Sequence, residues 1–228
     1  MSMPLPTSND WPGDVIYPES DGKPMAENPQ QGRVIRLLVC GFRRLYRGRP
    51  DMFVDGDFFW YPVQGEPSTV AAPDVTIIDQ LAAPIDVTTM GSYRQWIFGG
   101  RVLLAIEVLS PSNTWAEMAR KLTFYQRHGV QEYWVFDPAD GALEVYVRDG
   151  DELRKLGDPG SGLTSATTGV HLRVEGKELV VTDPDGRRWL APESEAARAD
   201  ELAARVDELA TEVATLRQRL GDVGTLPD

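Results

Sequence analysis

Apolar residues recur at helical spacing in two stretches of the first 130 residues. Over residues 29–48 they fall three and four positions apart, and the stretch ends at a Gly and a Pro, which predicts an amphipathic helix. Residues 114–128 show the same spacing between a Ser-Pro-Ser-Asn segment that can cap a helix and a glycine that can end one. The predicted apolar faces comprise Val34, Ile35, Leu37, Leu38, Phe42, Leu45 and Tyr46 in the first helix and Trp115, Met118, Leu122 and Tyr125 in the second.

Short runs rich in β-branched and aromatic residues predict a sheet around these helices. The pair Asp55-Gly56 lies between two apolar runs, so residues 52–54 and 57–63 are expected to form a hairpin. Residues 101–109, RVLLAIEVL, are almost continuously apolar, as is typical of a strand covered on both faces. Further strands are expected at residues 74–79, 132–138, 143–149, 170–174 and 178–183.

The composition changes at Ser194 to Ala, Glu, Arg and Leu. Apolar residues then alternate in steps of four and three, with Val at a and Leu at d, which favours a parallel two-stranded coiled coil. Glu212 at g and Arg217 at the following e position are complementary across such a dimer. Because so short a coiled coil is only marginally stable, a helix packed on its own domain is the alternative. The heptad positions are Leu202, Val206, Leu209, Val213, Leu216 and Leu220.

The chain is acidic, with 228 residues and a formal net charge of −12. The residues before Ala191 still hold more acids than bases, so the C-terminal segment does not account for the acidity. Nucleic-acid-binding domains are usually basic, and the composition therefore argues against a simple nucleic-acid binder. One helix nevertheless concentrates positive charge, either as a solvated face or as a surface that meets phosphates. These residues are Arg33, Arg36, Arg43, Arg44, Arg47 and Arg49.

The N-terminal residues lack the basic and apolar segments of a signal peptide, and no stretch approaches the roughly 18 apolar residues of a membrane span. We therefore expect a soluble, cytoplasmic protein with no membrane partner. The sequence holds one cysteine, Cys40, and two histidines, which leaves no Cys or His cluster for a metal. Any metal would be held by carboxylates, which favours Mg²⁺, Mn²⁺ or Ca²⁺.

A carboxylate interrupts the apolar strand 101–109 at Glu107. A buried, unpaired charge is costly unless it is paired, neutralised or bound to a metal. Asp74 begins another strand, directly after Pro73, and the two carboxylates converge if these strands are neighbours. A divalent cation would relieve their repulsion. Lys121, on the helix that follows, can reach the same end of the sheet and orient a water or stabilise charge on a phosphate in transition.

Each of these residues also fits a purely structural role. Lys121 is spaced for an i,i+4 ion pair with Glu117, and Asp74 is a reasonable turn residue after Pro73. Spacing alone leaves the metal site and the structural roles open.

Four strings resemble the Uma-type restriction endonuclease family of the PD-(D/E)XK phosphodiesterase superfamily: YPESDGKPMAENP, PDVTIID, IEVLSPSN and RKLTFYQRHGVQEYWVFDP. The resemblance runs from about Ile16 to Trp189. It implies an α/β, restriction-endonuclease-like fold, with a mixed β-sheet flanked by helices, to which a C-terminal coiled-coil helix is attached. Three segments are expected: an irregular N-terminal segment 1–27, an endonuclease-like domain 28–190, and a coiled-coil helix and tail 191–228.

The resemblance also implies roles for particular residues. Asp74 matches the aspartate of the Pro-Asp motif and Glu107 the acid of the (D/E)XK motif, and both would hold Mg²⁺ or Mn²⁺. Leu109 stands where the motif has its lysine, and Lys121 of the following helix is the matching residue. Two further residues are expected to support this site: Glu27 and Tyr125.

The expected function is a Mg²⁺-dependent endonuclease that hydrolyses phosphodiester bonds in nucleic acid, with DNA as the expected substrate. The arginines at positions 33, 36, 43, 44 and 47 are the candidate nucleic-acid-binding surface, and the C-terminal helix is the candidate homodimer contact. The alternative, favoured by the acidity, is a non-catalytic dimeric interaction or nucleic-acid-binding module on a nuclease fold. A third possibility is a dimeric scaffold in which the carboxylates are structural.

Overall fold

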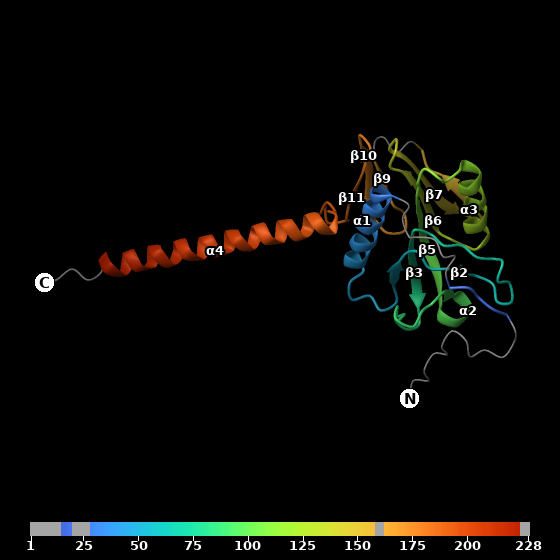
Figure 1. The fold of residues 1–228 in the computed structure, drawn as a ribbon, viewed down its shortest axis with the longest axis horizontal. Helices are drawn as coiled ribbons and strands as arrows, with labels where there is room; N and C mark the ends of the chain where they lie inside the picture. Colours follow the sequence, from blue (N-terminus) through green and yellow to red (C-terminus); the bar gives the residue numbers. More distant parts are fainter. Residues whose placement is uncertain (1–14, 20–27, 158–161, 224–228) are drawn as a thin grey trace, which may run out of the picture. The chain divides into compact units, whose positions relative to one another are not determined.

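A computed structural model describes residues 15–19, 28–157 and 162–223 of the chain (Figure 1). The chain divides into two compact units, with the division between Trp189 and Leu190. The first unit holds the sheets and three helices, and the second is a single long helix. We describe each unit by itself.

A six-stranded mixed sheet forms the centre of the first unit, in the order β1-β3-β5-β6-β7-β8. Its strands β5 and β6 are parallel and are connected by the helix α3, Trp115–Arg127, whereas the other neighbours are antiparallel. The prediction of a mixed sheet flanked by helices is confirmed. The strand bounds are β1 Phe53–Asp55, β3 Val75–Leu81, β5 Gly99–Val108, β6 Glu132–Asp137, β7 Ala142–Asp149 and β8 Glu152–Lys155.

Two smaller sheets accompany the central one. The first pairs two short parallel strands, and the second has three antiparallel strands in the order β11-β10-β9. A short helix, α2, directly precedes β5. The bounds are β2 Trp60–Tyr61, β4 Tyr93–Arg94, α2 Gln95–Phe98, β9 Leu163–Thr164, β10 His171–Glu175 and β11 Glu178–Thr182.

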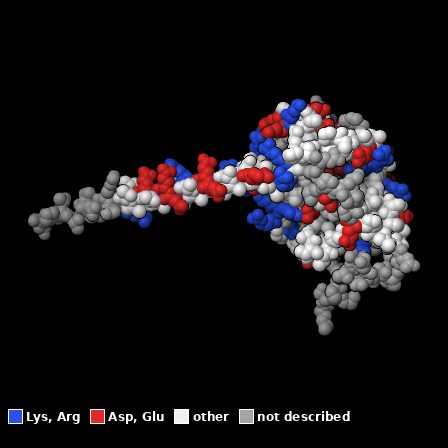
Figure 2. All heavy atoms as spheres, in the orientation of Figure 1, with Lys and Arg blue, Asp and Glu red and all other residues white. Residues whose placement is uncertain are grey.

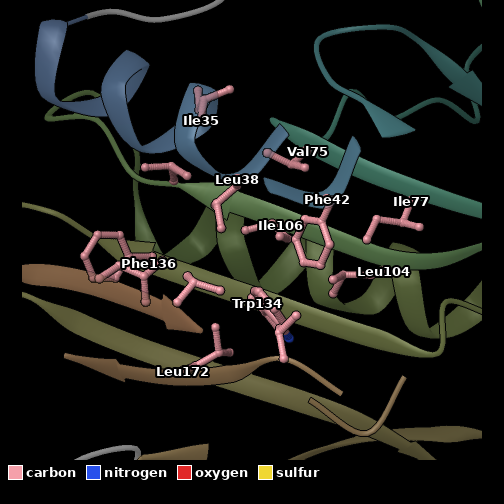
Figure 3. Packing of buried hydrophobic residues seen from close by; sticks show 14 of the residues in the cluster. Ile35, Leu38, Phe42, Val75, Ile77, Leu104, Ile106, Trp134, Phe136 and Leu172 are labelled. Atoms are coloured by element: carbon pink, nitrogen blue, oxygen red, sulfur yellow. The ribbon is translucent and has the colours of Figure 1, made fainter. Parts of the chain in front are cut away.

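Helices cover the two faces of the central sheet (Figure 1). The helix α1, Pro29–Leu45, packs on one face together with the small sheet that contains β10. Figure 3 shows Leu38 and Phe42 of α1 beside Trp134 of β6, in a fully buried cluster. On the other face α3 contributes Met118 and Tyr125 to a second cluster. Because both faces are buried, an ionised side chain on β5 needs a compensating partner.

The two long helices of the first unit begin at capping residues. Asn28 accepts the N–H of Gln31 through its side chain at 2.9 Å, and Thr114 accepts the N–H of Glu117 at 3.2 Å. Helix α3 ends before Gly129, whose φ of +80° is unfavourable for other residues. These caps fix the residues at which α1 and α3 begin.

The hairpin expected around Asp55-Gly56 is wrong. Strand β1 pairs antiparallel with β3, and residues 57–63 leave the central sheet. Trp60–Tyr61 pair instead with β4, in parallel. Asp57 has a φ of +58°, and its N–H bonds to the carbonyl of Pro73 at 3.2 Å, so the chain turns toward the start of β3.

At Gly56 the loop 55–57 lies too close to the backbone of Asp74 for a side chain to fit. A Cβ atom at this position would lie 1.9 Å from the carbonyl oxygen of Asp74. The glycine that resembled a hairpin signal is therefore required because the loop 55–57 lies directly against the residue that begins β3.

The second unit consists of the helix α4, Pro192–Val223. Its large apolar residues are exposed, with exposed fractions from 45% for Leu209 to 62% for Val206. The side chain of Leu220 lies outside the described residues. Among the helices described, none has the length and apolar character needed to cross a membrane. The exposed apolar positions with described side chains are Leu202, Val206, Leu209, Val213 and Leu216.

Candidate active site

The register of β3 against β5 places the two predicted carboxylates opposite each other. Val75 pairs with Ile106, so the next position in the antiparallel register sets Asp74 against Glu107. Val108 directs its N–H toward β3, where it donates to Oδ2 of Asp74 at 2.7 Å. Glu107, one residue earlier, therefore directs its own peptide groups away from β3. Its pair with Asp74 is of the non-hydrogen-bonded type, in which facing side chains are closest.

Helix α3 supplies two groups to the carboxylate of Glu107. Lys121 donates from Nζ to Oε2 at 2.7 Å, and Tyr125 donates its hydroxyl to Oε1 at 2.5 Å. The two residues are four apart, so they lie on one face of the helix. The side chain of Glu107 is 3% exposed and that of Lys121 is 24% exposed, so the ion pair is shielded on the carboxylate side and reached by solvent on the ammonium side.

Burial and mutual repulsion disturb the ionisation of the acids. Burial raises the pKa of Asp74 from 3.8 to about 8, and the nearby charge of Glu107 acts in the same direction. Burial also raises the pKa of Glu107, although Lys121 and Tyr125 oppose the shift. Burial, the largest effect, lowers the pKa of Lys121, but the charge and hydrogen bond of Glu107 together with the charges of Asp74 and Glu117 outweigh it, so that pKa lies above its ordinary value. Two acids held close together in a buried place are unfavourable unless positive charge joins them.

The donor set fits a hard divalent cation. The described residues contain no group of three or more Asp, Glu, His or Cys side chains that could hold a metal ion. Mg²⁺ does not need one, because it keeps several waters and is commonly bound by one or two carboxylates together with substrate phosphate. Each oxygen of Glu107 accepts one hydrogen bond and keeps a second lone pair. Asp74 uses Oδ2 for Val108 and accepts no bond at Oδ1 from the described residues.

The structural alternative for Lys121 does not occur. Lys121 forms its ion pair with Glu107, which is 14 residues away, and not with Glu117. Glu117 accepts instead from the side-chain amide of Asn113, at 3.3 Å. Glu27, which the sequence suggested as a supporting acid, lies outside the described residues.

The predicted arginine surface is exposed at every position except Arg44, and some of its members bond to the protein itself. Arg43 donates to Oδ2 of Asp55 at 2.6 Å, and Arg44 lies 5.8 Å above the ring of Trp189, so both are engaged with the protein itself. The exposed members are Arg33, Arg36, Arg43, Arg47 and Arg49. Figure 2 shows Lys and Arg gathered over α1, although the chain as a whole is acidic, with a net charge of −12.

Sequence reasoning missed two residues beside the site. Asp57 acts on Asp74 electrostatically, as a like charge that raises its pKa. Gln31 is 5% exposed and donates from Nε2 to the carbonyl of Val108 at 2.8 Å. A signal for Gln31 existed, because it lies four residues before Ile35 in the buried stripe of α1, where an apolar residue is normal. Asp57 had no such signal, because its position follows from the wrongly predicted hairpin.

Comparison with known proteins gives a family. The sequence profile of the Uma2 family, described as "Putative restriction endonuclease", matches residues 8–175. No functionally curated protein matches the chain. A crystal structure of a putative nuclease from Anabaena variabilis is similar over 64% of this chain and 77% of that chain, with 17% sequence identity and a TM-score of 0.45. The match of the family profile over most of the chain, Asp74, Glu107 and Lys121 included, shows that this protein belongs to the Uma2 family.

Proposed function

We propose that this protein is a Mg²⁺- or Mn²⁺-dependent endonuclease that hydrolyses phosphodiester bonds in DNA. Membership of the Uma2 family supports a nuclease-like function. The observation that carries the finer proposal is the facing pair of Asp74 and Glu107, with Lys121 bound to the second of them. Two facing acids at a strand end repel each other when both are ionised, and such unfavourable pairs are typical of functional sites.

The residues of this centre have different proposed roles. Asp74 and Glu107 are the residues that would hold the cation. Bound there, the cation would supply an activated water and neutralise the charge that develops on the phosphate. Lys121 keeps an ammonium at the solvent side of the pair, where it can orient a water or contact a phosphate oxygen. Tyr125, fully buried, fixes the orientation of the Glu107 carboxylate by its hydrogen bond.

The α1 surface is the proposed contact with the nucleic-acid backbone. Arg33, Arg36 and Arg47 are exposed on or directly after this helix, and the amide of Gln31 on the same helix reaches the strand that bears Glu107. Helix α1 covers the sheet face opposite α3, so it borders the site at its N-terminal turn, where Gln31 reaches Val108. Because the chain as a whole carries a net charge of −12, we expect binding to be weak at physiological salt and steeply dependent on salt concentration.

The test is cleavage of supercoiled plasmid and of single-stranded DNA in Mg²⁺ and in Mn²⁺, with the variant Glu107→Gln alongside the wild type. The chain offers a matched control in Glu144, which also bonds to a lysine and a tyrosine, Lys155 at 2.5 Å and Tyr146 at 2.6 Å. Glu144 lies on β7, whose neighbours are β6 and β8. In the strand order β7 is therefore separated from β3, which Asp74 precedes, by β5 and β6. The variant Glu144→Gln therefore loses the same kind of ion pair without losing a proposed metal ligand.

We expect metal-dependent cleavage by the wild type and by Glu144→Gln, and a loss of about 100- to 1,000-fold in Glu107→Gln, on the scale of removing a group that stabilises the transition state. Equal cleavage by all three proteins would mean that this centre is not the source of the activity. Absence of cleavage and of metal binding in the wild type would support the second candidate, a non-catalytic interaction module. That candidate is favoured by the acidity and by the neutralisation of Glu107 within the protein itself.

We further propose that α4 joins two copies of the chain in a parallel coiled coil, and that the protein acts in the cytoplasm. The heptad positions of α4 are about half exposed in a single copy, which leaves an apolar stripe to be covered. A parallel, in-register pair places every a and d position against its equivalent and sets Glu212 against Arg217 of the second copy. An antiparallel pair with as many apolar layers would set Glu212 against itself.

The solution mass tests the dimer. The full chain should have twice the mass of a single copy, and the variant Leu209→Glu, which places a charge at a d position, should have the mass of one. The control Glu208→Gln changes the neighbouring c position, which faces away from the partner. An unchanged mass in Leu209→Glu would refute a dimer built on this stripe.

A further inference from the structure

The carbonyl of Val108 lacks the partner that a regular sheet would provide. The register of β3 and β5 that sets Asp74 against Glu107 sets Pro73 against Val108. Val108 directs both of its peptide groups toward β3, where its N–H meets Oδ2 of Asp74. Proline has no N–H to offer in return. The Pro-Asp sequence therefore satisfies the N–H of Val108 with a side chain and leaves its C=O without a donor from the sheet.

Gln31 supplies the missing donor from another element. Its Nε2 donates to the carbonyl of Val108 at 2.8 Å, in a buried bond that joins residues 77 apart in the sequence. Gln31 is 5% exposed and occupies the buried stripe of α1, four and seven residues before Ile35 and Leu38. A buried polar side chain in that stripe requires a partner, and the carbonyl at the end of β5 is one.

We infer that Gln31 is a positioning residue for the carboxylate pair, an inference that rests on the proposed function. It holds the C=O of Val108, in the peptide between Val108 and Leu109, while Asp74 holds the N–H of Val108, in the peptide that directly follows Glu107. Repulsion between Asp74 and Glu107 acts to separate the ends of β3 and β5, where no further strand hydrogen bonds follow. The amide of Gln31 opposes that separation and keeps the carboxylates close enough to share one cation.

The preceding residue provides a matched control. Gln30 donates from Nε2 to the carbonyl of Pro138, also at 2.8 Å, directly after the end of β6. Gln30 and Gln31 thus make the same kind of bond from the same turn of α1 to the ends of two neighbouring strands. The difference lies in what the strands carry, because β5 bears Glu107 whereas β6 ends in Asp137, which accepts from its own loop.

The experiment compares wild type, Gln31→Met and Gln30→Met, because Met keeps the length of the side chain without its donor. Binding of Mn²⁺ is measured by isothermal titration, and kcat and KM are measured separately for plasmid cleavage. We expect Gln31→Met to bind Mn²⁺ about tenfold more weakly and to lose about tenfold in kcat, with KM for DNA within twofold of the wild type. Gln30→Met should match the wild type in all three quantities, and it should lower the melting temperature less than Gln31→Met does, because Gln30 is exposed and its bond is only partly buried.

Equal Mn²⁺ affinity and kcat in Gln31→Met and Gln30→Met would overturn the role of Gln31 and leave the proposed function standing. If the wild type neither binds Mn²⁺ nor cleaves DNA, the proposed function fails, and the role of Gln31 fails with it. If Gln31→Met does not fold, Gln31→Leu replaces it, because Leu keeps apolar packing at this buried position and has no hydrogen to donate to Val108. The same tenfold losses are expected there, and wild-type values would overturn the inference.

Discussion

The substitution Asp74→Asn should stabilise the metal-free protein, and more so at high pH. Asn keeps a side-chain oxygen that can accept the N–H of Val108, as Oδ2 of Asp74 does at 2.7 Å. It removes the charge that faces Glu107. Since the folded protein holds the Asp74 carboxyl at a pKa of about 8, against an ordinary value of 3.8, ionisation at this position opposes folding.

The magnitude follows from the shift of the pKa. Below about pH 4 the carboxyl is protonated in both the folded and the unfolded chain, and the substitution changes little. Between pH 4 and pH 8 the unfolded chain loses this proton while the folded chain retains it, so the free energy of unfolding of the wild type falls as pH rises. A shift of 3.8 to about 8 sets an upper limit of roughly 6 kcal/mol above pH 8. Because Asp74 is only partly buried, we expect about 2 kcal/mol at pH 8 and roughly a quarter of that at pH 4.

Thermal unfolding in EDTA at pH 4 and pH 8 measures the effect. An advantage of about 2 kcal/mol corresponds to a rise in melting temperature of about 5 °C for a protein of this size. Excess Mn²⁺ should then reverse the order at pH 8, because the cation stabilises only a protein that binds it. A variant that is less stable than the wild type would refute the argument that burial and Glu107 oppose the ionisation of Asp74. An increase in stability that is the same at both pH values would refute it too.

Three further predictions concern other parts of the structure. Tyr125→Phe keeps the ring packing but removes a donor to the buried carboxylate of Glu107, so kcat should fall by about three- to tenfold and the melting temperature by a few degrees, whereas an unchanged kcat would exclude an orienting role. Arg33→Ala and Arg47→Ala should each raise KM, leave kcat unchanged and reduce the salt dependence of DNA binding by about one unit of slope, and an unchanged slope would mean that α1 does not meet phosphates. Thr114→Ala removes the cap of α3 and should cost about 1 kcal/mol in urea-induced unfolding, whereas Thr123→Ala, an exposed position in the same helix, should cost less.

Much of the fold was predictable because its signals are local. The helical spacing in 29–48 and 114–128 gave α1 and α3 to within a few residues, although the cap of α3 is Thr114 and not the Ser-Pro-Ser-Asn segment before it. The continuous apolar run of 101–109 gave the central strand β5. The hairpin at Asp55-Gly56 failed because a glycine is needed equally for a tight turn and for close contact between distant segments. Only the pairing of β1 with β3, which is not local, decides between the two.

The site was predictable where its residues broke a pattern. Glu107 in an apolar strand and Asp74 at the start of another gave a reason to expect that they converge, and the register of β3 and β5 brings them together. Lys121 was ambiguous, because its i,i+4 spacing from Glu117 fitted a surface ion pair equally well. Gln31 could not be assigned a partner, because its bond to Val108 spans 77 residues and depends on the packing of α1 over the end of β5.

Anomalous diffraction at the manganese edge, from crystals of the wild type grown or soaked in Mn²⁺, would show whether the facing carboxylates hold a cation. We predict one strong peak in contact with both Asp74 and Glu107, and no peak at this place in crystals of Asp74→Asn. A peak elsewhere in the molecule, or none between these two side chains at a Mn²⁺ concentration that supports cleavage, would contradict the assignment of this centre as the site of phosphodiester hydrolysis.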